Sequence, residues 1–115
     1  MNITRLHAYA IPGQGIITLI SDIAKSTQVE FRELRVDMMD PMDFNGVPYL
    51  DNDQNVQYAQ LDLNKILQLK DDTKAIVVVS GVDFWDHNED VKNKIDNLER
   101  DNTTFVYVRH LKIVE

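Results

Sequence analysis

The strongest constraint on the fold is a run of five apolar residues, AIVVV at positions 75–79, followed by Ser80 and Gly81. A half-exposed strand would alternate between apolar and polar residues, and this run does not. Strands that are apolar at every position are typical of parallel sheets with helices on both faces. The run therefore predicts a central strand, around which the other elements are placed.

The length and charge of the chain limit what it can be. At 115 residues, with 43% hydrophobic and 27% charged residues, it is expected to form a single folded domain over residues 1–115. The 19 acidic residues outnumber the 12 basic ones, for a net charge of -7. Such a surface repels phosphates and anionic lipids, and no basic patch offsets it, so direct binding to nucleic acid or to a membrane is not expected.

The chain contains no cysteine, which excludes disulfides, thiol redox chemistry and thiolate metal sites. Its N-terminus shows no basic segment followed by a long apolar run, so no signal peptide is recognised. The longest apolar runs are about five residues, far shorter than the roughly 20 needed to span a membrane. A cytoplasmic location is therefore the expectation.

Apolar periodicity and turn residues divide the chain into alternating strands and helices. The predicted elements are strands at 3–11, 29–37, 75–79 and 103–113, a hairpin with arms at 46–50 and 55–58, and helices at 15–28, 60–69 and 88–100. Residues 38–45 are expected to form a loop. The residues expected to face the core from the last two helices are Leu63, Ile66 and Leu67, and then the stripe of Val91, Ile95 and Leu98. This order predicts an α/β three-layer sandwich with a mostly parallel sheet of five or six strands and helices on both faces.

Over residues 3–69, the order of strand, turn, helix, strand, the segment GVPYL at 46–50, hairpin and helix resembles the thioredoxin-like superfamily, particularly glutaredoxins and the N-terminal domain of glutathione transferases. The resemblance implies a cis peptide bond between Val47 and Pro48. Where that family carries its redox cysteines, this chain has PGQG at 12–15, so thiol-disulfide exchange is excluded. The predicted topology is thioredoxin-like or, more generally, Rossmann-like.

Two turns are candidates for binding a small ligand. Gly13, Gln14 and Gly15 precede the first helix, where free backbone amides can hold an anion. Ser80 and Asp83 follow the central strand, on the side of a parallel sheet where ligands bind. The first turn lacks the third glycine of a dinucleotide motif and the lysine of a P-loop, so a tight turn is the favoured interpretation and no cofactor is expected.

The acidic segment 83–90 contains carboxylates and His87, which could coordinate a divalent metal. Asp86 or Asn88 can equally cap the following helix, and acidic residues in a first helical turn suit its dipole. Capping is the favoured interpretation, and no metal site is assigned. No serine or threonine lies in a motif that marks a catalytic nucleophile, so a catalytic triad is unsupported; enzymatic activity is left open and is not the favoured interpretation.

The candidate partner-binding residues are apolar and lie in two polar loops. Trp85, the only tryptophan, and Phe84 lie in the acidic loop after the central strand, where Trp85 either fills the core or is an exposed anchor, with the anchor favoured. Met38, Met39 and Met42 form either an adaptable contact surface or, as favoured here, an apolar cluster under the hairpin.

Three functional hypotheses follow. The favoured one is a non-enzymatic, acidic interaction protein that binds another protein, of the kind found among prokaryotic or phage regulatory factors. The second is a small-molecule or nucleotide-binding domain, or an enzyme, that uses the loops at the strand ends. The third is an inhibitor that mimics nucleic acid and occupies the basic site of a DNA- or RNA-binding protein. Self-association stays open.

Overall fold

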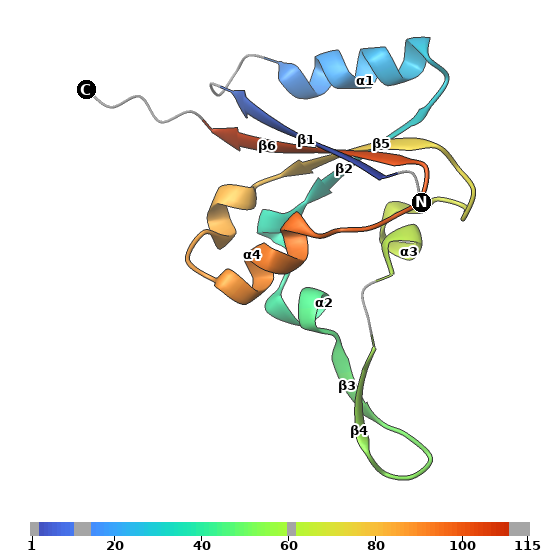
Figure 1. Ribbon diagram of the computed structural model, residues 1–115, viewed down its shortest axis with the longest axis vertical. Coiled ribbons are helices and arrows are strands. Elements are labelled where there is room, and N and C mark those ends of the chain that lie inside the picture. The colour runs from blue at the N-terminus through green and yellow to red at the C-terminus, as the bar shows by residue number, and fades with distance from the viewer. Residues whose placement is uncertain (1–2, 11–14, 60–61, 111–115) are drawn as a thin grey trace.

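The fold is organised by a parallel sheet of four strands in the order β1-β6-β5-β2, as seen in a computed structural model that describes residues 3–10, 15–59 and 62–110 (Figure 1). These strands are β1 (Ile3–Ala10), β2 (Glu30–Arg35), β5 (Ala75–Ser80) and β6 (Thr103–His110). The remaining strands, β3 (Val47–Leu50) and β4 (Val56–Ala59), form an antiparallel hairpin outside this sheet. The fold is therefore α/β, as predicted.

The predicted central strand is confirmed, because β5 pairs in parallel with both β6 and β2. Its side chains alternate between the two faces of the sheet. Val77 and Val79 belong to one buried cluster, whereas Val78 belongs to the other. All three valines are fully buried (0% exposed), which explains why the run has no polar position.

Helices lie on both sides of this sheet (Figure 1). On one side, α1 (Ile16–Ser26) packs through Ile16, Ile17 and Ile20 on a small cluster that includes Val78 and Val106. The larger cluster on the other side is covered by several short elements. They are the 3-10 turns η1 (Val36–Met38) and η2 (Val82–Trp85) and the helices α2 (Pro41–Asn45), α3 (Leu63–Leu67) and α4 (Glu89–Asp96).

The predicted apolar stripe of the last helix region is confirmed, because Val91, Ile95 and Leu98 are all buried in the larger cluster. Tyr107 of β6 lies under this stripe, and its hydroxyl donates a hydrogen bond of 2.7 Å to the Ile95 carbonyl oxygen. Burial raises the pKa of Tyr107, as expected for a phenol taken out of water. The helix is thus held to the sheet by apolar contact and by one buried hydrogen bond.

Two local predictions were wrong. The segment expected to be a loop contains α2, which starts with a capping box between Asp40 and Asp43 and has Pro41 in its first turn. In α3, Leu63 and Leu67 are buried as expected, but Ile66 is exposed, because so short a helix turns only one side toward the sheet.

The arrangement of the strands also differs from the prediction. The described residues place four strands in the sheet instead of five or six, because the predicted hairpin forms but stays apart. Strands β1 and β2, joined by α1, lie at opposite edges with β6 and β5 between them. No peptide bond among the described residues is cis, and this includes the bond between Val47 and Pro48.

Candidate functional site

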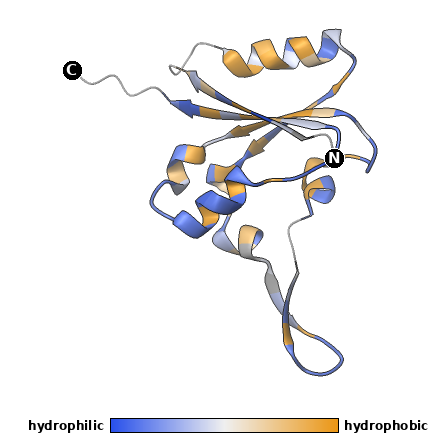
Figure 2. Ribbon diagram, viewed as in Figure 1, coloured by the Kyte–Doolittle hydropathy of each residue, from blue (hydrophilic) through white to orange (hydrophobic). Residues whose placement is uncertain are grey.

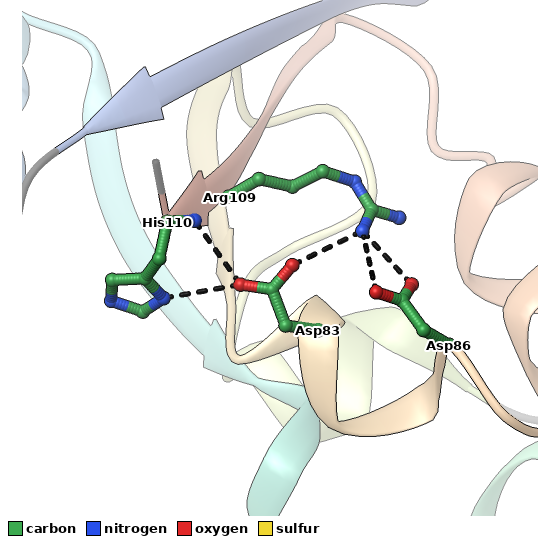
Figure 3. Close-up of polar contacts among 4 residues, drawn as sticks. All are labelled: Asp83, Asp86, Arg109 and His110. Carbon is green, nitrogen blue, oxygen red and sulfur yellow. Dashed lines mark hydrogen bonds and ion pairs between the residues drawn. The ribbon is translucent and has the colours of Figure 1, made fainter. Parts of the chain in front are cut away.

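A polar cluster lies at the carboxyl end of the sheet, where β5 and β6 finish (Figure 3). Asp83, from η2, accepts hydrogen bonds of 3.1 Å from the backbone amide of His110 and from Nη1 of Arg109. Nδ1 of the His110 imidazole also lies 3.1 Å from its Oδ2 atom. The same Arg109 nitrogen reaches Asp86 at 2.9 Å, so one guanidinium joins two carboxylates.

The electrostatics of this cluster favour the charged forms of Asp83 and Arg109. Partial burial of Asp83 acts to raise its pKa, but the bonds from His110 and the charge of Arg109 outweigh burial and lower that pKa below its usual value. The hydrogen bond to Asp86 raises the pKa of Arg109. Because Asp83 already accepts hydrogen bonds from Arg109 and His110, the main role of the cluster is structural: it connects η2 to the end of β6.

Of the other predicted ligand-binding residues, Ser80 and Gly15 are described, and neither is bonded to this cluster. Ser80 donates a hydrogen bond of 3.0 Å to Oε1 of Glu33 on the neighbouring strand β2. Gly15 adopts a left-handed conformation at the start of α1, as a tight turn requires. Gly13 and Gln14 lie outside the described residues. The anion-binding interpretation of that turn stays a prediction.

The carboxylates of segment 83–90 are used in the protein's own structure. Asn88 caps α4, and its side-chain oxygen accepts a hydrogen bond of 3.2 Å from the Val91 amide. Glu89 and Asp90 lie in the first turn of that helix, where their charge suits the helix dipole. The described part of the chain contains no group of three or more histidines or carboxylates placed to hold a metal ion.

The interpretation of Trp85 as an exposed anchor is wrong. Its side chain is only 4% exposed, and its indole nitrogen donates a 2.7 Å hydrogen bond to the Val36 carbonyl oxygen. Its ring packs edge-on against Phe44 of α2 and Phe84 of its own turn. Trp85 therefore closes the larger core, and its apolar neighbours come from segments distant in the sequence.

The other predicted partner-binding residues differ in exposure. Phe84, Met38 and Met42 are all more than half exposed, whereas Met39 is partly buried against the larger core. The turns that carry Met38 and Phe84, η1 and η2, pack side by side. The favoured interpretation of an apolar methionine cluster under the hairpin is therefore wrong for Met38 and Met42, and these two residues and Phe84 stay candidates for partner contact.

A second surface, which the sequence did not single out, is the hairpin of residues 47–59, called here the arm. It projects from the body of the protein (Figure 1), and Figure 2 shows hydrophobic residues along it, away from the sheet. Leu50 pairs with Val56 and Pro48 pairs with Tyr58, so these four side chains lie on one face. Leu50, Val56 and Tyr58 are 67%, 58% and 59% exposed.

The turn of the arm is held by Asp51. Its Oδ1 atom accepts hydrogen bonds of 2.9 Å from the amides of Asp53 and Asn55, and Oδ2 accepts one of 3.2 Å from Gln57. The bond from the Asn55 amide is the main cause that lowers the pKa of Asp51. The polar tip of the arm is thus ordered by its own hydrogen bonds, while Leu50, Val56 and Tyr58 on its apolar face are largely exposed.

A broad groove of about 1300 Å³ lies at the base of the arm, between α3 and the segment that follows α4. Tyr58 lines it, so the apolar face of the arm continues into the groove. Lys94 and Arg100 are the basic residues of its lining. They are outnumbered by the carboxylates of Asp62, Asp71, Asp72, Asp90, Glu99 and Asp101.

Comparisons with protein-family models, with curated proteins and with solved structures gave no match for this chain. No helix in the described ranges is long and apolar enough to cross a membrane. Its function is therefore inferred from its own residues and their geometry.

Proposed function

We propose that this chain is a non-enzymatic interaction protein that binds another protein through the arm. The observation that carries the proposal is the face formed by Leu50, Val56, Tyr58 and Pro48, which is exposed and apolar. β3 and β4 contact each other extensively and make no comparable contact with any other described element. A two-stranded hairpin without a packing partner is marginally stable in water, so a partner that covers this face would stabilise it.

Charge favours one kind of partner. The groove that continues from Tyr58 is lined mainly by carboxylates, and the chain as a whole carries a net charge of -7. A protein surface with an apolar patch beside lysine and arginine residues would complement both features. A second copy of this chain is a poor partner for this surface, because the carboxylates of its groove and of its arm would repel those of the first copy.

The proposal is tested by photo-crosslinking in the native host, with a photoreactive amino acid in place of Tyr58. The matched control carries it in place of Tyr9, which is equally exposed but lies on β1. Partners that crosslink at Tyr58 and not at Tyr9 are identified by mass spectrometry and purified. Binding of the purified partner is then titrated by calorimetry against the unmodified chain and against arm variants.

The double variant Leu50→Ser with Val56→Ser is expected to weaken binding at least thirtyfold, which corresponds to about 2 kcal/mol. The control Leu19→Ser removes an equally exposed leucine on α1 and is expected to leave the affinity unchanged. Equal affinities for the double variant and the unmodified chain would overturn the proposal.

The acidic groove also supports the nucleic-acid-mimic hypothesis as a special case of partner binding. Under that hypothesis, the captured partner is itself a DNA- or RNA-binding protein, and this chain competes with nucleic acid for its basic site. A fluorescence competition assay with the purified partner and its nucleic acid distinguishes the two cases. A mimic displaces the nucleic acid, whereas an accessory factor binds alongside it.

For the scaffold, we propose a Rossmann-like three-layer sandwich with the arm as an insertion between β2 and β5. The parallel pairing of all strands in the sheet supports this more than a thioredoxin-like topology. In either case, the scaffold carries the interaction surface and supplies no chemistry of its own.

A further inference from the structure

The two edges of the sheet are protected very differently. At β2, Arg32 donates a 2.8 Å hydrogen bond to the Leu67 carbonyl oxygen, which draws α3 over that edge, and Glu30 pairs with the same arginine. Charged side chains and a covering helix are the usual protection of an edge strand. At the other edge, β1 runs for eight residues, and no described strand pairs with its outer side.

The side chains of β1 add exposed apolar surface to this free edge. Leu6 is 52% exposed and Tyr9 is 62% exposed. Ala8 and Ala10 belong to the cluster under α1, and alternation along the strand puts Leu6 on the same side of the sheet. α1 contacts β2 and β5, so Leu6 at the far edge stays uncovered.

Charge indicates what could cover this edge. All but one of the 19 acidic residues lie beyond residue 29, and residues 1–29 contain Asp22 against Arg5 and Lys25. Two copies of a chain with a net charge of -7 repel each other over most of their surfaces. The surface formed by β1 and α1 is the region where they can meet without opposing carboxylates.

We propose that β1 pairs antiparallel with β1 of a second copy, around a two-fold axis perpendicular to the sheet, and so joins two four-stranded sheets into one. This symmetry keeps both α1 helices on the same side, where Leu6 of each copy lies near the axis. A stable dimer buries about 800 Å² per copy, more than one strand edge supplies. Leu6 on one face of β1 and Tyr9 on the other provide additional apolar surface beside the paired strands.

The dimer uses a surface separate from the arm, so it goes beyond the proposed function. Its first test is sedimentation equilibrium of the full chain over a range of concentrations. The unmodified protein is expected to sediment as a dimer. The double variant Leu6→Glu with Tyr9→Glu brings carboxylates of the two copies close together across the axis, where they repel each other. It is expected to raise the dissociation constant of the dimer about a hundredfold or more. The control Leu50→Glu, on the arm, is expected to leave the dimer intact.

A second test does not depend on how well the glutamate variant folds. Because the chain has no cysteine, one introduced cysteine is its only thiol. When two β1 strands pair antiparallel around this two-fold axis, one residue near the middle of β1 lies directly opposite the same residue of the second copy. Under oxidising conditions, either Leu6→Cys or His7→Cys is therefore expected to form a disulfide-linked dimer, whereas Ser26→Cys at the end of α1 is not.

Three results would overturn the proposal. The first is a monomer at all concentrations, and the second is a dimer that Leu50→Glu dissociates and the β1 variant does not. The third is the absence of a disulfide at both β1 positions when the unmodified protein is dimeric.

Discussion

The central strands and the arm are built from similar residues and have opposite environments. Val77, Val78 and Val79 of β5 are fully buried between two layers, whereas Leu50 and Val56 of the arm are largely exposed. Both segments are extended and rich in residues that favour strands. The difference lies in the neighbouring strands. β5 lies between β6 and β2, whereas each arm strand pairs with the other and with no further described strand.

This difference separates residues that hold the fold from residues that are available to a partner. Each apolar side chain in β5 stabilises the folded state, since unfolding would return it to water. Apolar side chains on the arm are already in water, and they contribute free energy only when another molecule covers them. Substitutions in the two regions should therefore have separable effects on stability and on binding.

The largest expected effect is that of Val77→Asp, which puts a charge at a fully buried position of the central strand. The cost of burying an unpaired carboxylate amounts to several kcal/mol, a large part of the stability of a small domain, so cooperative folding should be lost. Circular dichroism during urea unfolding measures this. Leu50→Asp on the arm is the control and should keep a cooperative transition, and a cooperative Val77→Asp variant would contradict the central position of β5.

The second expected effect is that of Trp85→Ala, which removes the ring that closes the larger core and its bond to Val36. The cavity should lower the free energy of unfolding by about 3–5 kcal/mol. Phe84→Ala, at the exposed neighbouring position, should cost much less. Thermal and urea unfolding of both variants measure the difference, and similar losses for the two would show that the contrast between core and surface does not hold in this turn.

A third prediction compares two carboxylates with lowered pKa values, Asp83 at the end of the sheet and Asp51 in the arm. A carboxyl group whose pKa is lower in the folded state stabilises the protein at pH values above its unfolded pKa, and this stabilisation is lost as the pH falls through the folded pKa. Asp83→Asn should therefore cost about 1 kcal/mol at pH 7, after allowance for its partial exposure, and the difference from the unmodified chain should fade below about pH 4.

Urea unfolding of both proteins between pH 7 and pH 3 measures this effect. Asp51→Asn is the comparison. The hydrogen bonds of Asp51 lie within the arm, so this substitution should hardly change the urea midpoint of global unfolding. A pH-independent loss for Asp83→Asn would mean that the charge of Asp83 does not contribute.

The smallest expected effect is that of Leu50→Ser on the isolated chain. Because this side chain is 67% exposed, the free energy of unfolding should change by about 0.5 kcal/mol or less. Thermal unfolding with and without the captured partner tests this directly. Without the partner, the variant should have the same melting temperature as the unmodified chain. With the partner, it should lack the increase in melting temperature that the unmodified chain shows. A large loss in the isolated chain would mean that the arm packs on the body.

Much of the fold could be predicted from local patterns. The unbroken apolar run at 75–79, the two hairpin arms at 46–50 and 55–58 and the stripe of Val91, Ile95 and Leu98 each predicted an element that the structure contains. These signals are local, since periodicity and turn chemistry act over a few residues. The helix α2 had such a signal as well, in Asp40, Pro41 and Asp43, and it could have been predicted from its capping box.

What the sequence could not determine depended on residues that are distant along the chain. Strand order is set by which edges meet after the chain collapses, and local periodicity carries no information about that choice. Trp85 is buried because Val36 and Phe44 come to it from more than forty residues away. Likewise, Leu50 and Val56 look like core residues in the sequence, and only the tertiary structure leaves them exposed, because the hairpin that carries them stays outside the four-stranded sheet.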